Sequence, residues 1–101
     1  LKKEGARVNY KKNPDGTTSP YEINATYLDA LSSPTDTTEW RSKRFLAAHT
    51  FLVTLPGVPA IYIQSVLGSR NDYKGVEKTG ENRKIYRQKF LLADIEKELQ
   101  T

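Results

Sequence analysis

The side chains best suited to bind a polar group lie between residues 70 and 87. This stretch mixes guanidinium, ammonium, carboxylate and amide groups, at Arg70, Asn71, Asp72, Lys74, Glu77, Lys78, Glu81, Arg83, Lys84 and Arg87. An arginine fork can hold hydroxyls, a carboxylate or a phosphate through paired hydrogen bonds. The same composition is also typical of a network of surface ion pairs, each of which contributes little to stability. Residue types alone leave both interpretations open.

Metal and nucleophilic chemistry have few candidate residues. The sequence has no cysteine and a single histidine, His49. These counts exclude a disulfide scaffold and a thiolate metal site, and they argue against a histidine-built zinc site. We therefore expect no metal and no cofactor. His49 lies in a predicted apolar helix with no carboxylate near it in sequence, so we expect a packing role rather than a catalytic one.

Two further patterns carry little weight. Asn24-Ala25-Thr26 matches an N-glycosylation acceptor, but a match of three residues often arises by chance. Lys2, Lys3, Arg7, Lys11 and Lys12 lie near Tyr10 and could form a nucleic-acid-binding arm. Elsewhere acidic residues are mixed with basic ones and the net charge is only +4. We expect no nucleic-acid partner, and a basic non-enzymatic module stays as an alternative.

Length and composition bound the size of the core. The chain has 101 residues, of which 37% are hydrophobic, and this share is the same whether its 6 Tyr or its 6 Gly are counted as apolar. Globular domains usually have an apolar share of about 45–50% when Gly is counted and Tyr is not. A chain this short and lean in apolar residues is marginal alone. It contains no methionine and opens on Leu1-Lys2-Lys3-Glu4, so we expect an internal piece of a longer protein.

No segment has the pattern of a membrane span or a secretory leader. The longest apolar runs fall far short of the ~20 residues that a membrane span needs. No charged segment leads into an apolar one, as a signal peptide would require. We expect a cytoplasmic protein with no membrane partner.

The N-terminal quarter predicts a hairpin-like arrangement. Leu1 to Glu4 resembles a frayed helix end stopped at Gly5, and Arg7 to Lys11 alternates as a short strand. Asn13-Pro14-Asp15-Gly16 is a turn signal, because Pro fixes φ and Gly tolerates positive φ. Residues 17 to 24 are then predicted to be extended.

The middle of the chain predicts one long helix from about Thr38 to Leu55. Ser33 is the expected cap, with Pro34 at the first helical position. A stripe at helical spacing is formed by Phe45, Ala48, Leu52 and Leu55. Because Leu46, Phe51 and Val53 fall outside this stripe, we expect the helix to be buried on more than one side. Pro56-Gly57 ends it.

The last part predicts a strand, a loop and a helix. Val58 to Ile63 is an unbroken apolar run, typical of a parallel strand covered on both faces. Such a strand needs two neighbours, and this sequence has no strong candidates for them. Residues 64 to 87 are predicted to be a long polar loop, and Phe90 to Leu99 an amphipathic helix. In α/β folds the loop after a strand is where ligands bind, so we expect a site between Gln64 and Arg87.

Several stretches taken together resemble one family, the sucrose phosphorylase group of the α-amylase superfamily. They are similar above all to its sugar and glucosylglycerate phosphorylases, and they follow one another in collinear order over nearly the whole chain. The stretches are Ser19-Pro20-Tyr21-Glu22-Ile23-Asn24, Thr26-Tyr27-Leu28-Asp29-Ala30-Leu31, Arg44-Phe45-Leu46-Ala47-Ala48, Leu55-Pro56-Gly57-Val58-Pro59-Ala60-Ile61-Tyr62, Leu67-Gly68-Ser69-Arg70-Asn71-Asp72, Gly75-Val76-Glu77-Lys78-Thr79-Gly80 and Arg83-Lys84-Ile85-Tyr86-Arg87.

The resemblance implies an α/β fold, the C-terminal part of a (β/α)8 TIM barrel. Residues 1–101 would be a fragment of the catalytic barrel domain and not a complete domain. They would cover the loop after strand 7, helix 7, strand 8 near Val58 to Ile63, and the following loop and helix. The family's catalytic carboxylates would lie upstream of this chain. We therefore expect no catalytic residue here and no activity from the fragment alone.

The resemblance also implies a reaction and its binding residues. The family transfers a glucosyl unit with retention from sucrose or a related α-glucoside to inorganic phosphate, giving α-glucose 1-phosphate. Arg83 matches the arginine that holds the donor sugar, and Tyr21 matches a loop tyrosine that helps receive phosphate. Glu22 stands where sucrose phosphorylases carry a glutamine on the acceptor side, which puts strict sucrose specificity in doubt. Tyr86 replaces the usual asparagine.

The expected partners are therefore an α-glucoside such as sucrose, inorganic phosphate and the remainder of the parent barrel. A hydrolase or transglycosylase of the α-amylase type is an alternative within the same superfamily. It would be distinguished by release of glucose that does not depend on phosphate.

Overall fold

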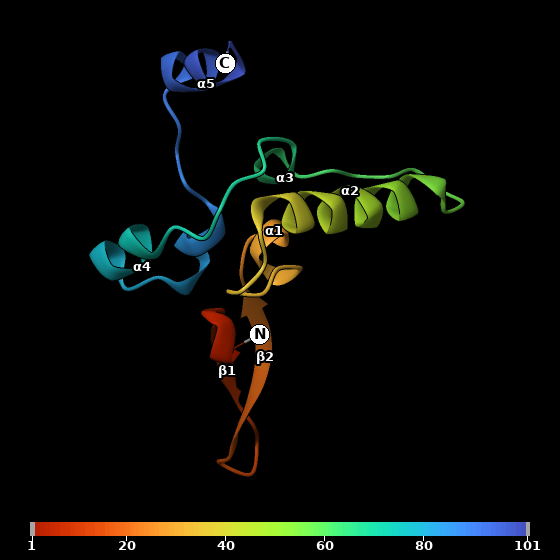
Figure 1. The fold of residues 1–101 in the computed structure, drawn as a ribbon. Helices are drawn as coiled ribbons and strands as arrows, with labels where there is room; N and C mark the ends of the chain where they lie inside the picture. The colour runs from red at the N-terminus through yellow and green to blue at the C-terminus, as the bar shows by residue number, and fades with distance from the viewer. Residues whose placement is uncertain (1, 101) are drawn as a thin grey trace.

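The chain forms a β-hairpin followed by one long helix and several short ones, in an open arrangement (Figure 1). The computed structural model describes residues 2 to 100, so Leu1 of the predicted N-terminal helix end lies outside the described residues. The elements are, in order, η1 (Lys2–Glu4), β1 (Arg7–Lys12), β2 (Thr18–Asn24), α1 (Tyr27–Ala30), α2 (Thr38–Thr54), α3 (Ile63–Val66), α4 (Tyr73–Thr79), η2 (Asn82–Tyr86) and α5 (Leu92–Leu99).

The hairpin confirms the predicted strand, turn and extended segment. Strands β1 and β2 pair antiparallel, from Arg7 opposite Asn24 to Lys12 opposite Thr18. Gly16 has φ 84°, the left-handed conformation that glycine adopts without steric cost. The Asp15 carboxylate accepts hydrogen bonds from the backbone and the hydroxyl of Thr17, at 3.0 and 2.6 Å. The turn is therefore closed by its own side chains.

Helix α2 matches the predicted span, but its predicted cap is wrong. The hydroxyl of Thr37, not Ser33, accepts a hydrogen bond from the backbone N–H of Trp40, at 3.3 Å. Ser33 instead opens a turn before the helix, in which its carbonyl accepts from the N–H of Asp36 at 3.0 Å. The Asp36 carboxylate in turn accepts from the N–H of Ser33 at 2.6 Å. Asp36 therefore stabilises the turn that leads into α2.

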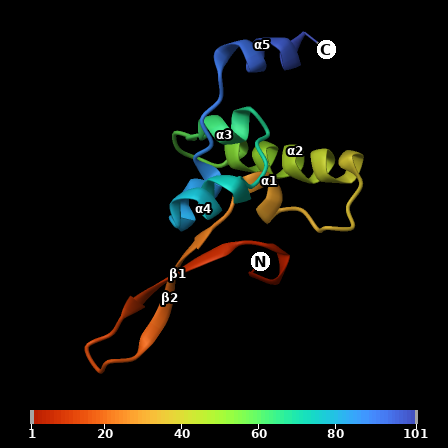
Figure 2. The ribbon, with the colours of Figure 1, turned by 90° about the vertical axis from the view of Figure 1, so that its left-hand side faces the viewer.

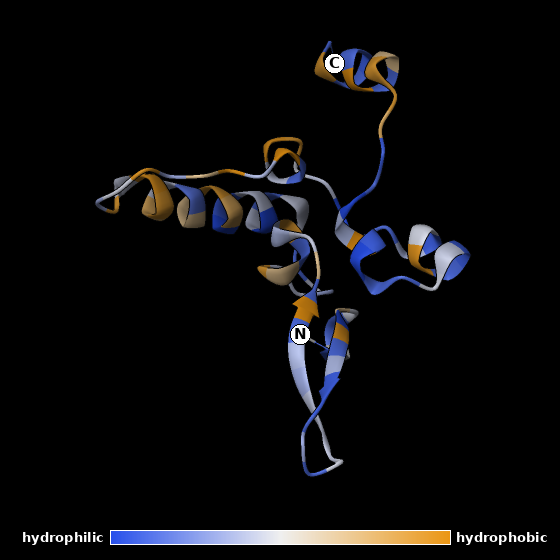
Figure 3. Ribbon diagram, turned by 180° about the vertical axis from the view of Figure 1, so that it is seen from behind, coloured by the Kyte–Doolittle hydropathy of each residue, from blue (hydrophilic) through white to orange (hydrophobic). Residues whose placement is uncertain are grey.

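Only one face of α2 is covered, so the prediction that it is buried on more than one side is wrong for the described chain. Phe45, Ala48 and Leu52 of the predicted stripe are half-buried. Leu46 and Phe51 are 64% and 67% exposed. The physical reason is that α1 is the one element that packs substantially on α2 in residues 2 to 100. Figure 3 marks the hydrophobic positions on α2 and α5.

The predicted strand at Val58 to Ile63 does not form in the described chain. Residues 58 to 62 have no regular secondary structure, and Ile63 is the first residue of α3. They return from the end of α2 to α3 as an extended chain (Figure 1), with Val58 98% exposed. A strand exists only where neighbours satisfy its backbone hydrogen bonds. The β1–β2 hairpin is the one sheet in the described residues, and it does not reach this segment.

The predicted loop over residues 64 to 87 contains three short helices, α3, α4 and η2. Asp72 caps α4, since its carboxylate accepts from the N–H of Gly75 at 2.9 Å. Gly80 ends α4 with φ 71°. The sequence did not predict these helices because α4 and η2 are short and polar. Helix α4 buries only Val76, and η2 buries only Ile85. The predicted C-terminal helix is confirmed as α5, which stands apart from the other elements (Figure 2).

The core is small and lies where the hairpin, α4 and η2 meet. The buried hydrophobic residues among those described are Ala6, Val76 and Ile85. The accessible surface is 7939 Å², against about 5,800 Å² for a compact monomer of this mass. The radius of gyration is 15.9 Å, against about 13 Å for a compact chain of this length. Among residues 2 to 100 we find no helix with the length and apolarity to cross a bilayer.

Candidate functional site

The three binding residues expected from the sequence lie together. Arg83 on η2 donates from Nε to both carboxylate oxygens of Glu22 on β2, each at 3.1 Å. A second donor of the same fork, Nη2, reaches the hydroxyl of Tyr21 at 3.2 Å. Arg83 and Glu22 are separated by 61 positions in the sequence. The tertiary structure therefore joins a hairpin strand to the polar segment near the C-terminus.

Asn9 is a further member of this cluster that no sequence pattern predicted. Its Nδ2 donates to Glu22 Oε2 at 2.8 Å, and its Oδ1 accepts from Asn82 Nδ2 at 2.7 Å. Hydrogen bonds thus join Asn82 to Asn9, Asn9 to Glu22 and Glu22 to Arg83, and the chain itself joins Arg83 to Asn82, so that the four residues form a circuit. The turn at residues 13–16 was not a sufficient signal, because regular counting back from it along both strands would place Asn9 opposite Tyr21. A register irregularity between Asn9 and Tyr10 sets Asn9 opposite Glu22 instead.

Backbone packing holds the circuit in place. The pairing of β1 with β2 fixes Asn9 against Glu22. The N–H of Asp72 donates to the carbonyl of Ile85 at 2.8 Å, and the Ile85 side chain is fully buried. Because Ile85 lies two residues beyond Arg83 on η2, its burial fixes the position of the helix that carries the guanidinium.

Hydrogen bonds and charge keep both partners of the central pair ionised. The hydrogen bond from Asn9 is the main cause that lowers the pKa of Glu22, followed by the hydrogen bond from Arg83. Arg87 lowers the pKa of Glu22 further through its charge. The pKa of Arg83 is raised, mainly by its hydrogen bond to Glu22. The site therefore presents a compensated ion pair at neutral pH.

A hollow of ≈ 400 Å³ opens beside the circuit. It is lined by Asn9, Gly80, Glu81, Asn82, Arg83 and Arg87. Amides and guanidinium groups are donors suited to hydroxyls and to oxyanions. No group of three or more metal-ligating side chains occurs among the residues that the structure describes. The chemistry that this hollow supports is the binding of a polar or anionic ligand.

Arg70 and Asn71, at the start of the 70–87 stretch, have structural roles. The Asp29 carboxylate on α1 accepts from the N–H of Asn71 at 2.6 Å and forms an ion pair with Arg70. The side-chain carbonyl of Asn71 accepts from the N–H of Thr26 at 2.7 Å. These contacts fasten the segment before α4 to α1. For these residues the ion-pair interpretation of the stretch holds.

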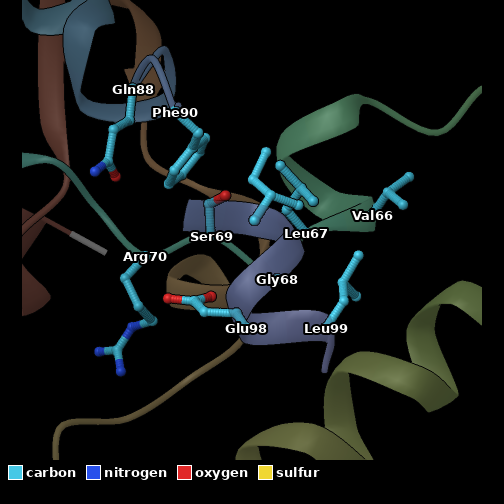
Figure 4. Close-up of a pocket in the computed structure, with 10 residues that line it drawn as sticks. Val66, Leu67, Gly68, Ser69, Arg70, Gln88, Phe90, Glu98 and Leu99 are labelled. Carbon is cyan, nitrogen blue, oxygen red and sulfur yellow. The ribbon is translucent and has the colours of Figure 1, made fainter. Parts of the chain in front are cut away.

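A larger hollow, ≈ 570 Å³, lies between α3 and α5, and none of Arg83, Tyr21 and Glu22 lines it. Figure 4 shows Leu67, Phe90 and Leu99 along it, with Arg70 and Glu98 on one side. Its lining is largely apolar, which favours packing over recognition of a polar ligand.

His49 has the packing role predicted from the sequence, and Asn24 is inaccessible. The His49 ring lies 4.2 Å from the Phe45 ring and 5.2 Å from the Tyr27 ring, between centroids. Its Nδ1 lies 2.9 Å from the carbonyl of Phe45, one turn earlier on α2. This is a packing role. The side chain of Asn24 is fully buried, so in this fold it is not a glycosylation acceptor.

The chain is similar to segments of known carbohydrate phosphorylases. No family model matches the chain. It is 62% identical over 99 residues to glucosylglycerate phosphorylase of Escherichia coli K12. The matched region is 98% of the chain and 18% of that enzyme. It is 42% identical to glucosylglycerate phosphorylase of Spirochaeta thermophila, covering 98% of the chain and 17% of that enzyme.

The fold leads to the same group. The crystal structure of sucrose 6F-phosphate phosphorylase from Thermoanaerobacter thermosaccharolyticum superposes with a TM-score of 0.76 at 31% identity, over 98% of the chain and 20% of that protein. The chain thus has the sequence and fold of a segment of the glucosylglycerate and sucrose phosphorylases. It spans a fifth or less of the length of these relatives.

Proposed function

We propose that this chain is the substrate-binding segment of a retaining glycoside phosphorylase. The enzyme transfers a glucosyl unit from glucosylglycerate, sucrose or a related α-glucoside to inorganic phosphate. The bond from the anomeric carbon to the acceptor oxygen breaks, a bond to a phosphate oxygen forms, and the acceptor oxygen takes up a proton. The products are α-glucose 1-phosphate and the free acceptor.

The observation that carries this proposal is the convergence of Arg83, Glu22 and Tyr21 in a chain 62% identical to a glucosylglycerate phosphorylase. Arg83 holds the donor glucosyl unit through the N–H groups that Glu22 and Tyr21 leave free. Tyr21 assists the incoming phosphate, and Glu22 lies on the acceptor side. The double displacement itself needs two carboxyl groups about 5–5.5 Å apart, which this proposal assigns to the part of the enzyme outside the chain.

The proposal includes the finer fold. Residues 58 to 62 become strand 8 of a (β/α)8 barrel once neighbouring strands are present, and α2 is the helix before it. Their exposure here supports this, because an unbroken apolar run left in solvent is unfavourable. Ligands of such barrels bind at the carboxyl ends of the strands. The segment that carries Arg83 follows the carboxyl end of residues 58 to 62.

The test is a graft. In the grafted enzyme, this chain replaces the matching segment of the E. coli glucosylglycerate phosphorylase. Release of glucose 1-phosphate is followed from glucosylglycerate and from sucrose, with and without inorganic phosphate, beside the unaltered E. coli enzyme. We expect phosphate-dependent glucose 1-phosphate. A folded graft that releases free glucose regardless of phosphate, or that turns over neither substrate, would overturn the proposal.

A further inference from the structure

The charges around the hollow beside the circuit do not cancel. Glu22 is paired with Arg83 at 3.1 Å, and Glu81 lies 3.9 Å from Lys84. Arg87 also lines the hollow, but no carboxylate of residues 2 to 100 lies within ion-pairing distance of it. One positive charge therefore remains without a paired anion at the hollow.

The position of Arg87 is restrained on two sides. Its backbone N–H donates to the carbonyl of Lys84 at 3.1 Å, closing η2. Its guanidinium lies 5.4 Å from the centroid of the Tyr86 ring, within the range of a cation–π contact. No hydrogen bond among the described residues uses the side-chain N–H groups of Arg87, so they are available to a ligand in the hollow.

We propose that Arg87 is a specificity-determining residue that binds the carboxylate of an anionic acceptor such as glycerate. A guanidinium edge matches the two oxygens of a carboxylate, and one unpaired cation balances the single negative charge of such an acceptor. Asn82 and Asn9 supply amides for the acceptor's hydroxyls in the same hollow. This inference rests on the proposed phosphorylase function, and it concerns only which acceptor the enzyme prefers.

The test uses the grafted enzyme in the synthetic direction, with glucose 1-phosphate as donor and glycerate as acceptor. The variants are Arg87→Gln, which removes the charge, and Arg87→Lys, which keeps it. Lys89→Ala is the control, because Lys89 is an exposed cation two residues away that does not line this hollow. The KM for each substrate, kcat and the melting temperature are measured for all four proteins.

We expect Arg87→Gln to raise the KM for glycerate about tenfold or more, the effect of losing a charge-assisted contact. The KM for glucose 1-phosphate and the melting temperature stay near those of the unsubstituted graft. Arg87→Lys gives a smaller rise, and Lys89→Ala gives none.

Two outcomes overturn the assignment of Arg87 while the graft remains active. The KM for glycerate could be unchanged in Arg87→Gln, or the KM for glucose 1-phosphate could rise as much as that for glycerate, which would make Arg87 a phosphate ligand. A folded graft without phosphorylase activity would instead overturn the proposed function. If Arg87→Gln does not fold, a KM for glycerate in Arg87→Lys equal to that of the unsubstituted graft would overturn the assignment, and a selective rise would support it.

Discussion

Arg83 is the residue on which the candidate site depends most. Of the five N–H donors of a guanidinium, one contacts Glu22 and one contacts Tyr21, which leaves 5 − 2 = 3 for a ligand. The fork is thus both anchored and available. A lysine at this position could not make both sets of contacts, because its ammonium is a point donor on a flexible stem.

Arg83→Ala should lower the kcat of the grafted enzyme by orders of magnitude with little effect on folding. The side chain of Arg83 is 45% exposed, so its loss opens no cavity in the core. Phosphorolysis rates and thermal melting of the variant check this, with Lys89→Ala as the exposed-cation control. Near-normal turnover in a folded Arg83→Ala protein would remove Arg83 from the site.

Glu22 predicts a definite pH dependence of stability. Its pKa is lowered in the folded protein, chiefly by Asn9 and then by Arg83. Its ionised form therefore stabilises the fold above the ordinary pKa of 4.5, and this contribution is lost as pH falls through the lowered pKa. Asp15 and Asp36 add dependences of the same sign.

We expect the melting temperature of the grafted enzyme to be insensitive to Glu22 ionisation between pH 7 and about 5. Below the ordinary carboxyl pKa it should fall more steeply than that of Glu22→Gln, which cannot take up this proton. Melting curves recorded down to about pH 3 measure the difference. Parallel curves for the two proteins would show that Glu22 is not held ionised by the circuit.

Residue identities predicted this site only in part. Arg83, Tyr21 and Glu22 were found from a resemblance to a known family. Asn9 was missed, because an asparagine on a short exposed strand has no chemical signature of its own. Its role follows from the strand register, which sets it against Glu22, and from the packing of η2, which brings Asn82 within 2.7 Å.

Among the elements, α4 matters because it holds η2. Asp72 serves both, since its carboxylate caps α4 and its backbone N–H binds the carbonyl of Ile85. The elements that the sequence predicted well are those with strong local signals, the 13–16 turn and α2. Those it missed, α1, α3, α4 and η2, are short helices for which propensity and periodicity are weak guides.

Asp72→Ala should destabilise the grafted enzyme by about 1 kcal/mol, the typical effect of removing an N-cap side chain. Because the backbone bond to Ile85 remains, η2 keeps its place and kcat changes less than in Arg83→Ala. Denaturant unfolding with parallel kinetics gives both quantities. The matched control is Asp94→Ala in the first turn of α5, where no side chain caps the helix. Equal effects of the two substitutions would contradict the capping role.

On the scale of the whole molecule, the chain leaves most of its apolar residues in solvent. Phe51, Leu91, Leu92 and Leu99 are 67%, 71%, 69% and 79% exposed. The three buried hydrophobic side chains of residues 2 to 100 cannot offset the conformational entropy of about 100 residues, since each fixed residue costs about 1–2 kcal/mol.

We therefore expect the isolated chain not to unfold cooperatively. Its far-ultraviolet circular dichroism should change gradually with temperature, and it should bind a dye specific for exposed apolar surface. The grafted enzyme serves as the folded reference. A sharp thermal transition from a species that sediments as a monomer would instead show an independently stable domain.

The sequence by itself determined the local elements and the family resemblance. Turn chemistry, helix periodicity and short motifs depend on neighbouring residues, and they predicted the hairpin, α2, α5 and the residues Arg83, Tyr21 and Glu22. Only the tertiary structure decided that Asn9, Glu22, Asn82 and Arg83 close one circuit, and that residues 58 to 62 have no strand partner here. Both outcomes depend on contacts between segments far apart in sequence, which register and packing create and which no local pattern encodes.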